Sequence, residues 1–125
     1  MSNEFSQLVG KTLTHIEGAV GDDVMTFTTS EGERYQMWHS QDCCESVSIE
    51  DISGDLSDLI GTPIVLAEES TSDSAPDTTT ERYRDESETW TFYRLATAKG
   101  FVVIRWFGAS NGYYSESVDF ARVTP

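Results

Sequence analysis

The sequence predicts an α+β domain with a mostly antiparallel sheet of six or seven strands, about one short helix and a long acidic loop. Three observations predict this fold. Apolar and polar residues alternate over several short stretches, which is the period of a β-strand. Turn residues separate most of these stretches by only a few positions. One further segment repeats its apolar residues at spacings of three and four, which is the period of a helix.

The first expected strands form a meander over residues 11–19, 24–30 and 34–40. The stretches "VGDD" and "EGE" separate them, and glycine and aspartate are typical turn residues. Connections this short join antiparallel neighbours, because a parallel connection needs a dozen or more residues. We therefore expect these three strands to be consecutive in one sheet.

The expected helix covers residues 49–60, "IEDISGDLSDLI". Its isoleucine and leucine residues would lie on one apolar stripe. Gly54 lowers the helix propensity of the segment, so two short turns are the alternative. Gly61 and Pro63 are typical of residues that follow the end of a helix.

The second half of the chain adds a half-buried strand, a hairpin closed by an "AKG" turn, and a final strand. The expected strands occupy residues 63–69, 89–98, 101–108 and 113–123. Residues 70–88 are rich in Ser, Thr, Asp and Glu and nearly free of aliphatic residues. We interpret them as a flexible acidic loop within a single domain that spans residues 1–125.

Charge is the most unusual property of the composition. The chain has 22 acidic and 8 basic residues and a formal net charge of −14, while 38% of its residues are hydrophobic. Residues 45–88 hold most of the surplus, with thirteen acidic residues and two basic ones. Such a field repels nucleic acid and anionic membranes. It attracts basic protein surfaces, above all those that hold DNA or RNA.

We therefore expect an acidic surface that binds a basic groove. On the expected helix, the acids would lie away from the apolar stripe in a row that imitates a phosphate backbone. Two more acids end the strand at residues 63–69. The candidate partner-binding residues are Glu50, Asp51, Asp55, Asp58, Glu68 and Glu69. The simpler interpretation is a solvated face that keeps the protein soluble.

The stretch "HSQDCCESV" holds both cysteines of the chain. Zinc binds imidazole, carboxylate and thiolate groups. Adjacent side chains of a strand point to opposite faces, so both cysteines reach one ion only if the chain turns there. The candidate zinc ligands are His39, Asp42, Cys43 and Cys44, with His15 as a further ligand from the first strand. The alternatives are two small buried side chains or a strained disulfide between neighbours.

Catalytic motifs are absent from the sequence. It contains no G-x-G-x-x-G, no phosphate-binding P-loop and no G-x-S-x-G. An acidic neighbourhood disfavours the thiolate form of a cysteine, which argues against Cys43 or Cys44 as a nucleophile with His39 as its base. We expect a protein that is not an enzyme. A small metal-binding or thiol enzyme is one alternative, and a structural or housekeeping protein with a solubilising acidic coat is another.

The opening residues, "MSNEFSQLVGKTL", lack the basic and apolar regions of a secretory signal. No apolar run approaches the roughly 20 residues that a membrane-spanning helix needs. We therefore expect a cytoplasmic protein without a membrane partner.

Two blocks carry a resemblance to a known family: "HSQDCCESV" at residues 39–47 and "SNGYYSESVD" at residues 110–119. They share Glu-Ser-Val, an echo too short to indicate a repeat. Together with the expected strands, they resemble a family of small acidic proteins of unknown function from phages and prophages. The resemblance implies a mobile-element setting and supplies no catalytic residues. Small acidic phage proteins are often inhibitors of host defence, and anti-CRISPR proteins are the leading example.

Charge and resemblance together predict a non-enzymatic inhibitor in the host cytoplasm. It would bind the basic surface of a nucleic-acid-binding defence protein, such as a Cas9-type effector, and block the loading of DNA or RNA. It would not bind nucleic acid directly. The acids named above would make the contact, and a zinc ion would be the one expected cofactor.

Overall fold

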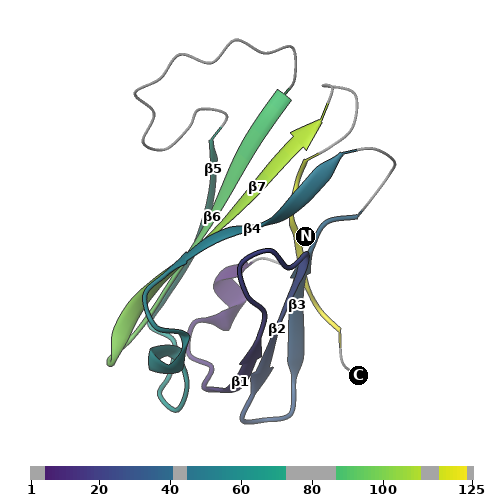
Figure 1. The fold of residues 1–125 in the computed structure, drawn as a ribbon. Helices are drawn as coiled ribbons and strands as arrows, with labels where there is room; N and C mark the ends of the chain where they lie inside the picture. The colour runs from purple at the N-terminus through teal and green to yellow at the C-terminus, as the bar shows by residue number, and fades with distance from the viewer. Residues whose placement is uncertain (1–4, 41–44, 73–86, 111–115, 124–125) are drawn as a thin grey trace.

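Two four-stranded antiparallel sheets pack against each other in the computed structural model, which describes residues 5–40, 45–72, 87–110 and 116–123 (Figure 1). The strand orders are β1-β2-β3-β8 and β4-β7-β6-β5. The first sheet contains β1 (Leu13–Glu17), β2 (Val24–Thr29), β3 (Arg34–Trp38) and β8 (Asp119–Arg122). The second contains β4 (Ser46–Ser53), β5 (Leu66–Ser72), β6 (Ser87–Thr97) and β7 (Gly100–Ser110). Two 3-10 turns, η1 (Phe5–Leu8) and η2 (Leu56–Leu59), complete the described elements.

The predicted meander is confirmed in the first sheet. In its middle strand, Phe27 lies opposite Ile16 of β1 and Tyr35 of β3. The last strand, β8, joins the free side of β3 and places Phe120 opposite Met37. It is shorter than the predicted strand at residues 113–123, because residues 116–118 precede it outside the sheet.

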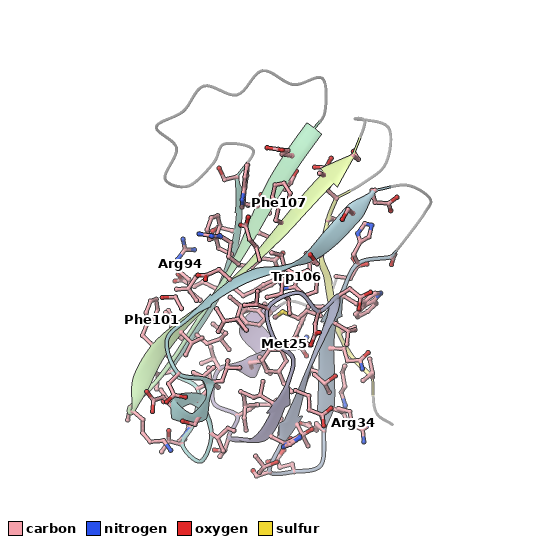
Figure 2. The ribbon with its side chains drawn as sticks, in the orientation of Figure 1. Met25, Arg34, Arg94, Phe101, Trp106 and Phe107 are labelled. Carbon is pink, nitrogen blue, oxygen red and sulfur yellow. The ribbon has the colours of Figure 1, made fainter. Side chains whose placement is uncertain are left out.

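The predicted hairpin is confirmed in the second sheet, where β6 and β7 pair along their whole lengths. One face of this hairpin is buried, as Tyr93, Leu95 and Ile104 show. The opposite face carries Arg94, Phe101 and Phe107, which point away from the first sheet in Figure 2. The hairpin is flanked by β4 on the β7 side and by β5 on the β6 side.

The predicted helix at residues 49–60 is wrong. Its first part belongs to β4, and only Leu56–Leu59 form a 3-10 turn. The β4–β7 register shifts between Ile49 and Asp51, so Glu50 is the extra residue of a bulge. The bulge lets Ile49 and Ile52 both face the core, although a regular strand would turn residues three apart to opposite faces. A bulged strand thus produced the apolar spacing of a helix.

The described part of the chain is therefore mostly antiparallel β, with eight strands instead of six or seven and 3-10 turns instead of the short helix. It includes no helix that is long and apolar enough to cross a membrane. The centre of the expected acidic loop, residues 73–86, lies outside the described ranges. Of its two ends, residues 70–72 belong to β5 and residues 87–88 to β6.

One hydrophobic core fills the space between the sheets. Met25 from the first sheet and Trp106 from the second both point into it (Figure 2). The turn η1 contributes Phe5, whose ring lies edge-on to Tyr93 at 4.7 Å and to Phe120 at 5.1 Å between centroids. Full burial of one large apolar side chain contributes about 1.5–3 kcal/mol, so this core is the main source of stability.

Candidate functional site

The two Glu-Ser-Val segments lie next to each other at one end of the sandwich. The first leads into β4 and the second precedes β8. Gly108 of β7 lies between them, since a Cβ added there would be 3.1 Å from Val47 Cγ2 and 2.9 Å from Glu116 Cβ. The glutamates, Glu45 and Glu116, are 4% and 7% exposed. The echo in the sequence therefore corresponds to two neighbouring segments with the same burial pattern.

His39, which follows β3, links the two segments. Its Nε2 lies 2.6 Å from Glu45 Oε2, and its Nδ1 lies 2.6 Å from the carbonyl oxygen of Ser117. The carbonyl can only accept, so Nδ1 carries a proton and donates it. Nε2 and Glu45 Oε2 lie within hydrogen-bond distance of each other. Both side chains are almost fully buried, which strengthens this pair relative to an exposed one.

The structure describes only one of the four predicted zinc ligands. Of the four predicted ligands, Asp42, Cys43 and Cys44 lie outside the described residues. His39 is described. To bind zinc through Nε2, it would have to give up its contact with Glu45. The Nδ1 contact with a backbone carbonyl is how proteins commonly orient a zinc-binding histidine. No group of three or more potential ligands occurs within the described ranges, so the zinc site stays a prediction.

Glu116 is held by hydroxyl groups of the second sheet. Thr89 Oγ1 of β6 donates to Oε1 at 2.7 Å, and Ser110 Oγ of β7 donates to Oε2 at 2.5 Å. Both donors are neutral. The carboxyl group of Glu116 is thus buried and hydrogen-bonded, and no described lysine or arginine forms an ion pair with it.

A cleft of about 320 Å³ opens beside Glu116. Residues 116–118 form one wall, Glu69 and Thr71 of β5 form another, and Thr89 and Thr91 of β6 lie between them. This volume is at the small end of the range for ligand pockets. Six of the seven lining residues carry side-chain oxygen atoms, but apolar atoms make up most of the exposed lining, so the cleft is suited to a ligand that has both hydrogen-bond donors and an apolar part.

Glu69 occupies an unfavourable environment for a charge. Burial raises the pKa of Glu69, a hydrogen bond from the Tyr93 hydroxyl (3.4 Å) opposes this rise, and the negative charge of Asp119 adds to it. Burial is also the main cause that raises the pKa of Tyr93, followed by the charge of Glu69. Glu69 is nevertheless exposed, so water screens part of its charge.

Three of the six predicted partner-binding acids have internal roles. Glu50 accepts from Arg105 Nε at 2.8 Å and from Trp90 Nε1 at 3.1 Å. Asp55 caps η2 by accepting from the backbone N–H and the hydroxyl of Ser57, and the backbone bond is the main cause that lowers the pKa of Asp55. Asp58 is half-buried against the turn of the β6–β7 hairpin.

The other three acids are Asp51 of β4 and Glu68 and Glu69 of β5. Asp51 of β4 and Glu68 of β5 are exposed on the outer face of the second sheet, where they lie opposite Arg105 and Arg94 in register. Glu69 points to the other face and lines the cleft. A row was expected only because the segment was taken for a helix.

Sequence reasoning missed Glu116 and Thr91, which lie in or beside the cleft. The repeated Glu-Ser-Val was the one signal that could have drawn attention to Glu116. Nothing in the sequence distinguishes Thr91 from the other threonines, because its position depends on how β5 and residues 116–118 lie around β6.

A two-sheet antiparallel domain with a small acidic cleft is thus the class of protein that the fold and site define. Residues 6–120 match the family model described as "Domain of unknown function (DUF7448)", and the chain belongs to this family. No curated protein and no solved structure matches the chain. The family description assigns no activity, so a function has to be argued from the charge and the site.

Proposed function

We propose that this protein is a non-enzymatic inhibitor of the anti-CRISPR type. It binds the basic surface of a nucleic-acid-binding defence protein, such as a Cas9-type effector, and prevents the loading of DNA or RNA. The net charge of −14 is the observation that carries the proposal, because a field of this size steers the protein towards cationic grooves. The phage setting rests on the resemblance of the blocks at residues 39–47 and 110–119.

The distribution of described charges favours one end of the sandwich as the contact. We call Glu69, Glu116 and Asp119 the acidic end. No described lysine or arginine forms an ion pair with any of them. The outer face of the second sheet is less suited to a cationic partner, since Arg94 and Arg105 lie among its acids.

Loading assays with purified Cas9-type effectors test this proposal. The protein is added before or after the guide RNA and target DNA, at low and at moderate salt. We expect it to block loading when added first, to have less effect when added last, and to weaken as salt rises. Normal loading by every effector at low salt, with the protein in excess, would contradict the proposal.

Two variants with equal loss of charge separate the acidic end from the net charge. The first combines Glu69→Gln and Asp119→Asn. The control combines Glu17→Gln and Glu31→Gln, two exposed positions of the first sheet and its turns. We expect the first variant to lose most of the inhibition and the control to keep it. Equal losses would mean that only the total charge matters.

A further inference from the structure

The cleft contains a hydroxyl group that lacks a partner. Thr91 lies between the walls and is 2% exposed, and its hydroxyl forms no hydrogen bond with any residue that the structure describes. The hydroxyl of Thr89, which also lines the cleft, donates its hydrogen bond to Glu116. The oxygen of the Thr91 hydroxyl is not one of the fully buried, unpaired polar atoms of the described residues, so it opens into the cleft and is available to a group bound there.

Two carboxyl groups face the same space and have no cation within the described residues. Glu116 accepts only from two hydroxyl groups, and Glu69 accepts only a long bond from Tyr93. Each carboxylate oxygen has lone pairs to spare after these bonds. Glu116 is buried and Glu69 lies exposed at the mouth of the cleft. A buried carboxylate such as Glu116 is normally paired with a cation, because water no longer compensates its charge.

We propose that this cleft binds the guanidinium group of an arginine side chain that the partner presents. The inference rests on the proposed function and names the group that its acidic end recognises. A guanidinium has five N–H donors in a plane, enough to reach Glu69, Glu116 and the Thr91 hydroxyl on different walls. Val118, which also lines the cleft, offers an apolar surface for the stem of the side chain. An ammonium group is a compact charge without the planar fork of donors, so we expect it to bind more weakly.

A small probe tests the cleft without the partner. N-acetyl-arginine amide is titrated into the full chain and followed by NMR at the Thr89, Thr91 and Val118 signals. The matched probes are the citrulline analogue, which has a similar shape without the charge, and the lysine analogue. We expect saturable shifts at these signals with the arginine probe and weaker ones with lysine. Shifts no larger than those with citrulline, or shifts spread over all exposed acids, would overturn the inference.

The variant Thr91→Val removes the hydroxyl and preserves the shape of the side chain. Its hydroxyl has no described partner, so we expect the fold to persist, as thermal unfolding would show. Affinity for the arginine probe should fall roughly tenfold, as for one lost hydrogen bond to a charged group. Thr28→Val, on β2 of the first sheet, is the matched control and should bind as the wild type does. Equal affinities of the two variants would count against a role for Thr91.

Results with the effector distinguish this inference from the proposed function. If an effector binds Thr91→Val as tightly as the wild type and with the same salt dependence, the inference fails and the inhibitor proposal stands. If no effector binds while the arginine probe still fills the cleft, the inhibitor proposal fails. The recognition of a guanidinium group by the cleft would then remain valid for a different partner.

Discussion

The indole nitrogen of Trp106 donates a hydrogen bond to the sulfur of Met37 at 3.3 Å. Trp106 belongs to β7 and Met37 to β3, so the bond joins the two sheets. Both residues are at most 1% exposed. An indole N–H can only donate, and a buried donor without an acceptor is costly. The methionine sulfur is a weak acceptor that meets this need without adding a polar side chain to the core.

Replacing this sulfur should cost more than an ordinary core exchange. Met37→Leu keeps the volume but leaves the Trp106 N–H without its acceptor, so we expect a loss of about 1–3 kcal/mol in the free energy of unfolding. Met25→Leu is the control, because Met25 is equally buried and accepts no hydrogen bond from a described residue. It should cost less than about 1.5 kcal/mol. Denaturant unfolding measures both, and equal losses would show that the bond contributes nothing.

Gly54 connects β4 to η2 with a φ of +104°, a conformation that other residues rarely adopt. A Cβ at this position would lie 2.5 Å from the carbonyl oxygen of Phe101. We expect Gly54→Ala to destabilise the protein by roughly 1–3 kcal/mol from backbone strain, with a further loss from the clash. Gly21→Ala is the control, since Gly21 has a φ of +97° and open space around it. Thermal unfolding that affects both variants equally would rule out the clash.

Glu69 should make stability depend on pH. Because its pKa is raised in the folded state, the folded protein holds this proton more tightly than the unfolded chain does. Stability should therefore fall as pH rises from the ordinary pKa of 4.5 through the raised one. We expect Glu69→Gln to be more stable than the wild type at neutral pH and to lose this advantage below pH 4.5. Denaturant unfolding across this range, with Glu68→Gln as the control, measures the difference.

Zinc at the H-x-x-D-C-C-E block is open to a direct measurement. Elemental analysis of the purified protein should find one zinc per chain, and a chelator should lower the melting temperature. His39→Gln should reduce the zinc content, whereas His15→Gln, on the exposed side of β1, should leave it unchanged. Zinc-free protein that a chelator does not affect would leave His39 with only its contacts to Glu45 and Ser117.

The strands that sequence predicted well are those with local turn signals. The meander and the β6–β7 hairpin each depend on a few Gly, Asp or Lys residues between alternating stretches. The helix failed at Glu50, since a bulge depends on pairing with β7 and changes the apparent period of the strand. Local sequence patterns do not contain that pairing.

The candidate site was less predictable than the fold. Its acids were expected near residues 50–58, but η2 and Arg105 engage two of them. Glu69 was named from the sequence for its charge alone. That it shares a cleft with Glu116 and Thr91 follows from the order of the strands and the packing of the two sheets, which bring distant residues together.

The aromatic contacts of Phe5 have a consequence for how quickly the protein can reach its native state. Phe5 touches Tyr93 and Phe120, which belong to different sheets and lie far from it in sequence. The ring can settle only after both sheets have assembled, and contacts between such distant residues form slowly. We therefore expect the core around Phe5 to be the last part of the interior that excludes water. This step should be observed as a late kinetic phase of refolding.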